Sequence, residues 1–181
     1  MTDRVCMIKP FILATFMSSL ILSACSSSEQ NKIQIHPEDY KVENVAQLEQ
    51  RFETLNQQLS RDYQNFKKNN AIAFSDQSIF DVQQLQTLDL HAVSRTSLKP
   101  VKQAYCKMMN DYFVQMYYLG HQNISLLSQT QWPKIKNQDL IKDFSSADQF
   151  YDFILNRYTH YRQAQEIMGF GCNLKQALQE N

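Results

Sequence analysis

The chain has 181 residues and carries 18 lysine and arginine residues against 18 aspartate and glutamate residues, so its formal net charge is zero. This balance argues against an electrostatic nucleic-acid binder, which would need a basic face. Only three glycines occur, which are too few for many tight hairpins. The composition therefore favours helices joined by loops, in a chain long enough for one domain with a substantial core.

The first element along the chain is an apolar run, FILATFMSSLILSAC, which starts at Phe11 and ends at Cys25. Arg4 and Lys9 precede it, and its length of about 15 residues is less than the roughly 20 that a bilayer-spanning helix needs. A basic start, a short apolar stretch and small residues behind it form the pattern of a secretory signal. We therefore predict that residues 1–24 are a signal peptide that is removed.

The end of this run, formed by Leu22, Ser23, Ala24 and Cys25, resembles the lipobox of bacterial lipoproteins. The resemblance covers only the leader and its processing site. It implies cleavage between Ala24 and Cys25, a diacylglycerol on the Cys25 thiol and acylation of the new amino terminus. Two or three acyl chains would hold the protein on a membrane almost permanently. The alternative is a buried amino-terminal helix that ends in cysteine, which leaves the three serines after Cys25 unexplained.

Two expectations concern the segments around this site. Met7 fits the signal pattern better than Met1 as the first residue, because residues 2–6 are partly acidic, and we expect translation to begin there. Ser26, directly after the cysteine, resembles the residue that sorts lipoproteins to the outer membrane rather than the inner one. The predicted location is thus the bacterial cell envelope, with the lipid on Cys25 as the membrane contact.

Residues 25–40 are polar and show no helical period, which is typical of a flexible tether behind a lipid anchor. Ile33 and Ile35 alternate with polar neighbours, so a short edge strand or a segment packed on the domain is the alternative. Without residues 1–24 the chain has 16 basic and 17 acidic residues, a net charge of −1. The folded domain is expected to comprise residues 41–181.

This domain is predicted to be all-α, a compact bundle of about four to five helices. The first helix is expected over residues 45–66, where apolar side chains recur at steps of three and four along one face. That face carries Leu48, Phe52, Leu55, Leu59, Tyr63 and Phe66. A bundle helix is preferred over a dimeric coiled coil, because three heptads with aromatic members are more typical of a bundle.

A second amphipathic segment is expected over residues 76–95, and a third from Leu98 to Leu119. Pro100 falls in the first turn of the third segment, where the missing amide is not needed, and Gly120 stands where a left-handed cap would end the helix. The apolar face of this helix is formed by Ala104, Tyr105, Met108, Met109, Tyr112 and Met116. Core packing is the preferred interpretation of these residues, with an adaptable binding groove as the alternative.

The carboxyl-terminal part is expected to hold a short helix over 123–128, a bend at Trp132 and Pro133, and another short helix up to Phe144. Ser146, followed three residues later by Gln149, resembles a capping box. It should begin a last long helix, which runs to about Met168 and is broken by Gly169 and Gly171. Residues 173–179 are expected to form a final short turn of helix.

Four cysteines occur in the chain. Cys6 lies in the leader and Cys25 is the predicted lipid site, which leaves Cys106 and Cys172. Because the envelope is an oxidising compartment, we predict a disulfide between them. Two separate buried thiols are the alternative, and a catalytic thiol pair is disfavoured because no C-x-x-C spacing accompanies these residues.

No motif in the sequence points to a defined reaction, cofactor or metal. The histidines lack the spacing of a helical metal site, and neither a G-x-S-x-G elbow nor a phosphate-binding loop is present. Polar side chains on the last long helix could share a face, although helical ion pairing explains them: Asp148, Asp152, Arg157 and His160. Three further carboxylates could in principle serve a glycan-cleaving pair: Asp139, Asp143 and Glu166.

Two classes of function remain. The first is a non-enzymatic lipoprotein that binds a protein partner or assists assembly at the envelope. The second is an enzyme or small-ligand carrier of the cell envelope. A contiguous exposed aromatic patch would favour the first class, and a deep pocket with converging polar groups would favour the second. The candidate residues for the partner surface are Tyr117, Tyr118, Trp132 and Tyr161.

Overall fold

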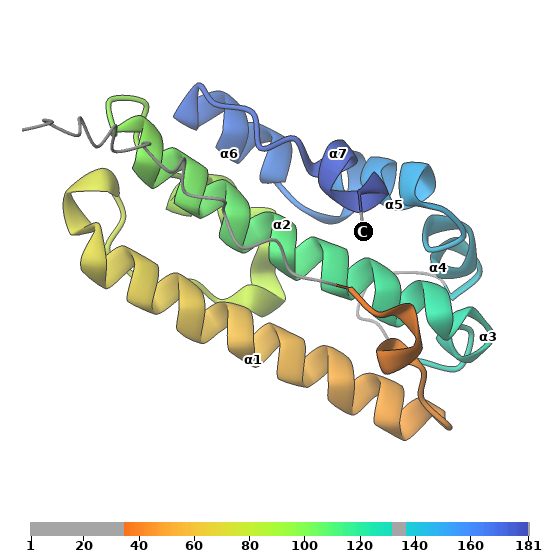
Figure 1. Cartoon of the computed structure of the whole chain (residues 1–181). Coiled ribbons are helices and arrows are strands. Elements are labelled where there is room, and N and C mark those ends of the chain that lie inside the picture. The colour runs from red at the N-terminus through yellow and green to blue at the C-terminus, as the bar shows by residue number, and fades with distance from the viewer. Residues whose placement is uncertain (1–34, 132–136, 181) are drawn as a thin grey trace, which may run out of the picture. The chain divides into compact units, whose positions relative to one another are not determined.

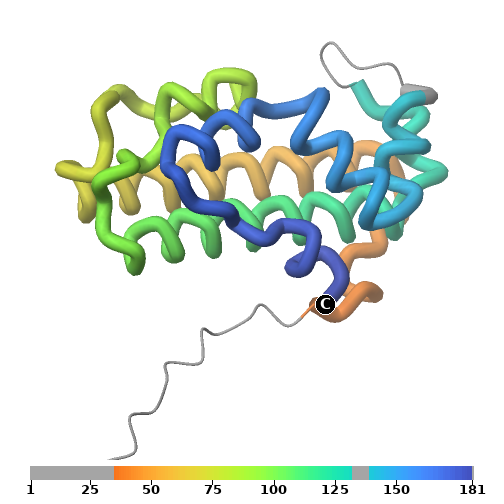
Figure 2. Tube along the Cα trace, turned by 90° about the horizontal axis from the view of Figure 1, so that it is seen from above, coloured from red at the N-terminus to blue at the C-terminus, as the bar shows by residue number. Residues whose placement is uncertain are grey.

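Two long antiparallel helices, α1 (Val45–Asn69) and α2 (Lys99–Gln122), pack against each other (Figures 1 and 2). The computed structural model describes residues 35–131 and 137–180. In that part of the chain every regular element is a helix, none is a strand, and Phe74 and Val93 form one isolated antiparallel bridge. The predicted all-α bundle is therefore confirmed.

The remaining elements are short. They are η1 (Pro37–Tyr40), η2 (Ala71–Ala73), η3 (Val82–His91), α3 (Ile124–Leu127), α4 (Asn137–Asp143), α5 (Ala147–Phe153), η4 (Ile154–Tyr158), α6 (Tyr161–Met168) and α7 (Leu174–Gln179). The first three are 3₁₀ helices, and η4 is a π-helical turn.

Helix α1 forms where its apolar spacing predicts it. Asn44 begins the helix, because its side-chain oxygen accepts a hydrogen bond from the Gln47 amide at 3.0 Å. The buried residues Leu48, Leu59 and Tyr63 lie on one face, together with Phe52. The first predicted helix is thus confirmed, and it continues three residues beyond Phe66.

Helix α2 begins at Lys99 with Pro100 in its first turn, as predicted, but the expected role of Gly120 is wrong. The helix continues to Gln122, and Gly120 lies buried inside it. A β-carbon at Gly120 would lie 2.1 Å from Cδ1 of Phe144. The glycine therefore permits the close approach of the Phe144 ring and does not cap the helix.

The helix expected over residues 76–95 is replaced by an irregular segment. Its regular part is the 3₁₀ helix η3, which is interrupted at Gln84. Ile79, expected on the apolar face, is 71% exposed. The segment instead packs against α1 and α6, and a hydrogen bond from the Ser94 amide to the Ala73 carbonyl at 2.7 Å joins its end to the residues just after α1. Tertiary contacts, rather than the local apolar spacing, therefore determine the backbone conformation of this segment.

The last long helix is divided in two. Ser146 caps α5, because its hydroxyl accepts from the Gln149 amide at 3.2 Å, as predicted. After the π-helical turn η4, Thr159 donates to the Ile154 carbonyl at 2.8 Å and accepts from the Tyr161 amide at 3.0 Å. These bonds end one helix and begin the next. Helix α6 stops at Gly169, which has a φ of 59°, and so this predicted end is confirmed.

The central element of the bundle is α2. It packs against α1, and also against α7, α3 and η1 (Figure 1). Cys106 of α2 and Cys172, which precedes α7, form the predicted disulfide with their Cα atoms 4.8 Å apart. The bond joins the central helix to the carboxyl-terminal segment, where Asn110 also donates to the Cys172 carbonyl at 2.5 Å.

The folded part starts before residue 41, which is earlier than the expected boundary. The Tyr40 ring lies 5.9 Å from the Tyr118 ring, measured between centroids. Asn123 donates to the Tyr40 carbonyl at 2.7 Å and accepts from the Val42 amide at 2.9 Å. Residues 37–40 therefore belong to the domain, and only the earlier part of the predicted tether lies outside the described residues.

Candidate functional site

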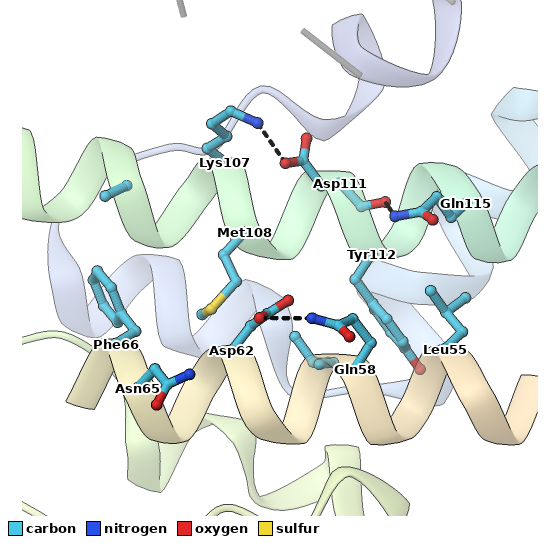
Figure 3. Close-up of a pocket in the computed structure, with 12 residues that line it drawn as sticks. Leu55, Gln58, Asp62, Asn65, Phe66, Lys107, Met108, Asp111, Tyr112 and Gln115 are labelled. Atoms are coloured by element: carbon cyan, nitrogen blue, oxygen red, sulfur yellow. Dashed lines mark hydrogen bonds and ion pairs between the residues drawn. The ribbon is translucent and has the colours of Figure 1, made fainter. Parts of the chain in front are cut away.

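A groove of about 440 Å³ lies between α1 and α2 and is partly open to solvent. Figure 3 shows the residues that line it. Helix α1 contributes Leu55, Gln58, Leu59, Asp62, Asn65 and Phe66 to its lining. Helix α2 contributes Ala104, Lys107, Met108, Asp111, Tyr112 and Gln115. Within each set the successive residues are one or three positions apart, so each set lies along one face of its helix.

The floor of the groove is apolar. Leu59 and Tyr112 are buried, and the Tyr112 hydroxyl donates to Oδ1 of Asn56 at 2.8 Å. Burial raises the pKa of Tyr112 well above its ordinary value. In Figure 3, Tyr112 and Met108 point from α2 toward α1. Leu55, Phe66 and Met108 are only half-buried, so apolar surface remains accessible along the groove.

The rims of the groove are polar and carry charge of both signs. On α2, Lys107 pairs with Asp111 at 2.5 Å, and Asp111 is partly buried. Burial raises the pKa of Asp111, and the hydrogen bond from Lys107 opposes this shift. On α1, Asp62 accepts a hydrogen bond from the neutral Gln58 amide at 2.8 Å. The lining therefore holds two carboxylates and one ammonium group.

A second polar cluster lies under the segment that follows α1. The Lys67 ammonium is 2.9 Å from Nδ1 of His91 and donates to the Ser78 carbonyl at 2.9 Å. Both side chains are only 6% exposed. Burial, followed by the Lys67 charge, lowers the pKa of His91, and burial lowers the pKa of Lys67. A neutral imidazole that accepts from the ammonium fits this arrangement, which binds α1 to residues 78–91.

The polar face expected on the last long helix does not form, because that helix is divided. Arg157 pairs with Asp143 of α4, which is fully buried, and burial raises the pKa of Asp143. His160 contacts Asp89 of η3 at 2.9 Å, and Lys175 reaches Asp148 at 3.0 Å. Each of these pairs joins two separate elements of the bundle.

The predicted aromatic partner surface is wrong in the residues that can be placed. Tyr161 is fully buried, and Tyr117 and Tyr118 are 7% and 8% exposed. Tyr117 and Tyr118 lie on α2, which is central and is covered on several sides. Tyr161 begins α6, and its ring packs against that of Phe113 of α2 with 5.1 Å between the centroids. Trp132 lies outside the described residues. Ala24 and Cys25, the predicted cleavage and lipid sites, lie outside them as well.

The apolar pattern of α1 and α2 already indicated the groove, although core packing was the preferred interpretation of the apolar residues of α2. Leu55 and Phe66 extend the apolar stripe of α1 beyond the width that one neighbouring helix covers. Met108 belongs to the row of residues for which an adaptable groove was the alternative to core packing. Core packing holds for Tyr105, Met109 and Met116, which are buried and do not line the groove. Ala104, Met108 and Tyr112 line the groove.

Two properties of the described residues limit the kinds of site they contain. Within residues 35–131 and 137–180, no three His, Cys, Asp or Glu side chains are arranged to hold a metal ion. No helix in these two ranges combines the length and the apolar character that crossing a membrane requires.

Comparisons with protein-family models, with curated proteins and with solved structures find no match for this chain.

Proposed function

We propose that this protein is a lipid-anchored lipoprotein of the bacterial envelope that binds a protein partner through the groove between α1 and α2. The protein acts as a binding or assembly factor and carries out no reaction of its own. The lipid on Cys25 places it at the membrane, more specifically the outer membrane, and the helical domain faces an aqueous compartment.

The lipobox pattern supports the anchor. Leu22, Ser23, Ala24 and Cys25 follow a basic and apolar leader of the length that signal peptides have. The disulfide between Cys106 and Cys172 agrees with folding in an oxidising compartment. Both observations point to export, and they come from separate parts of the chain.

The groove is the observation that carries partner binding. Leu55, Phe66 and Met108 present half-buried apolar surface between two polar edges. Apolar surface enclosed by a polar rim is typical of protein-binding sites. An open groove offers a partner area along its whole length, whereas a small molecule would need enclosure on most sides.

A photo-crosslinking experiment in native envelopes tests the proposal. Benzoylphenylalanine replaces Ala104, an exposed residue of the groove, in the full-length lipidated protein. The matched control carries the same group at Ala46, which is also exposed on a helix and lies outside the groove. We expect the protein with the group at position 104 to crosslink to one discrete partner, and the protein with the group at position 46 to give no such product.

The anchor is tested in the same experiment by Cys25→Ala, which should reduce the crosslink because the protein leaves the membrane. Equal crosslinking from Ala104 and Ala46 would contradict the groove as the site. A protein that yields no crosslink from either position, and that retains a small molecule in native mass spectrometry, would support the ligand-carrier class instead.

A further inference from the structure

We propose that the groove between α1 and α2 receives one amphipathic helix of a partner protein, and that this helix places a lysine or arginine beside Asp62. The inference rests on the proposed function, since it specifies the partner of the same groove. It is carried by the shape of the groove, by the distribution of its apolar side chains and by its charge.

The groove is long enough to hold a short helix. Its lining on α1 extends from Leu55 to Phe66, and its lining on α2 from Ala104 to Gln115. Eleven residue steps at 1.5 Å correspond to about 16 Å, or three turns of a partner helix. A third helix laid along two antiparallel helices buries one apolar stripe, as in helix-in-groove recognition.

The apolar side chains are distributed along this whole length. Phe66 and Met108 lie toward one end, and Leu55 lies toward the other, next to Tyr112 (Figure 3). A partner helix meets them with apolar residues at positions i, i+3 or i+4, and i+7. The flexible thioether of Met108 can adjust to side chains of different shape.

The charge of the groove selects a basic partner. The Lys107 ammonium is already paired with Asp111. Asp62 accepts only from the neutral Gln58 amide, and no lysine or arginine of residues 35–131 and 137–180 lies within ion-pair distance of it. Gln58 in turn accepts a hydrogen bond from the Arg61 guanidinium at 2.8 Å, but Arg61 does not line the groove. The residues that line the groove therefore carry a net charge of −1, which a cation on the flank of the partner helix would neutralise.

A second copy of this chain fits the groove less well. A two-fold contact through this face would bring the same surface of each molecule together. Asp62 of one copy would then approach the negative groove of the other, and like charges at an interface are repelled. Self-association through the groove is accordingly a separate outcome of the test.

Synthetic helices test the inference with the detergent-solubilised lipidated protein. Three fluorescent 18-residue peptides share one leucine stripe: the first has lysines on both flanks, the second has glutamates there, and the third is the lysine peptide broken by a central proline. Fluorescence anisotropy measures their affinities. We expect the lysine helix to bind at least tenfold more tightly than the glutamate helix, and the broken peptide to bind weakly.

Two pairs of variants assign the binding to the groove. Ala104→Trp fills the groove and should reduce the affinity for the lysine helix at least tenfold, whereas Ala46→Trp should leave this affinity unchanged. Asp62→Asn should reduce the preference for lysine over glutamate, whereas Glu53→Gln, an exposed position of α1 outside the groove, should not. Circular dichroism verifies that all four variants remain folded.

Equal affinity for the lysine and glutamate helices, or binding that survives Ala104→Trp, would overturn the inference. Concentration-dependent dimerisation that Ala104→Trp abolishes would replace it with self-association. The proposed function fails separately, in the crosslinking experiment. A partner captured at Ala104 whose crosslinked segment, mapped by mass spectrometry, is not a basic amphipathic helix would overturn the inference and leave partner binding intact.

Discussion

Lys67 and His91 form a buried polar contact, with the Lys67 ammonium 2.9 Å from Nδ1 of His91. Tyr63 donates to the His91 carbonyl at 2.7 Å, and the Phe80 ring lies 5.1 Å from the imidazole. The charged groups that bear on His91 are Lys67 of α1, Asp76 of the connecting segment and Asp89 of η3. Burial and the Lys67 charge outweigh the two carboxylates, so the pKa of His91 is lowered.

We expect the protein to lose stability below about pH 6.5 because of this residue. In the unfolded chain His91 takes up a proton near pH 6.5, whereas in the folded protein its imidazole stays neutral until the pH is lower. The contribution of His91 to the free energy of unfolding is therefore fully present above its unfolded pKa. It falls as the pH drops from the unfolded pKa toward the folded pKa. One proton corresponds to at most about 1.4 kcal/mol per pH unit. Urea unfolding at several pH values measures the slope.

The variant His91→Asn should reduce this slope below about pH 6.5, because asparagine can accept a hydrogen bond from Lys67 but does not titrate. His36→Asn is the control, since His36 is exposed. A slope that is the same in the wild type and in His91→Asn would show that other groups govern acid stability.

Gly120 and Gly171 provide a second comparison at the residue scale. Gly120→Ala would force the Phe144 ring to move, and we expect a loss of about 1–3 kcal/mol from overpacking. Gly171 has no heavy atom within 4 Å of the position that a β-carbon would occupy. Gly171→Ala should therefore change the free energy of unfolding by less than about 0.5 kcal/mol. Chemical denaturation measures both, and similar losses would contradict the close approach at Phe144.

At the scale of elements, the disulfide joins two parts that are distant in sequence. Cys106 lies in α2, Cys172 lies just before α7, and 66 residues separate them. The enclosed stretch includes α3 to α6, so the bond restricts the unfolded chain over almost half of the domain. Stabilisation by this route grows with the length of the enclosed loop.

Reduction of the disulfide should lower the free energy of unfolding by about 4 kcal/mol, the chain-entropy value for a loop of this length. Thermal unfolding with and without a phosphine reductant measures the loss. The double variant Cys106→Ala with Cys172→Ala should start from the reduced stability and show no further response to the reductant. A wild-type protein that is insensitive to reductant would contradict a stabilising role.

The division of the last long helix is a further effect at this scale. Asp89 of η3 contacts His160, and the Leu85 carbonyl accepts from the His160 amide at 3.1 Å. These contacts fix the chain at the break between η4 and α6. The apolar period continues through the break, and so the period alone predicts one helix where the structure has two.

At the scale of the whole molecule, the lipid anchor would decide where the groove operates. Under the proposed lipidation, Cys25→Ala should move the protein from the membrane fraction to the soluble fraction, because the acyl chains would supply its membrane affinity. Labelling with palmitate followed by fractionation measures both properties. Wild-type protein that takes up no palmitate, or that retains residues 1–24 in cells, would contradict the lipoprotein assignment.

The sequence by itself determined the elements whose signals are local. The stripe of α1, the proline at the start of α2, the Ser146 cap and the stop at Gly169 depend on residues within a few positions of each other. The disulfide followed from the cysteine count once Cys6 had been assigned to the leader and Cys25 to the lipid site. The all-α class followed from the shortage of glycine and from the helical period.

Only the tertiary structure decided which apolar side chains are covered. Tyr117 is buried because α2 is surrounded, and Tyr161 of α6 is buried because it packs against Phe113 of α2. Leu55 and Phe66 stay half-buried because, within residues 35–131 and 137–180, the groove beside them is open. The role of Gly120 likewise depends on Phe144, which is 24 positions away. Burial is a property of neighbours brought together by packing, and helical periodicity describes only one helix at a time.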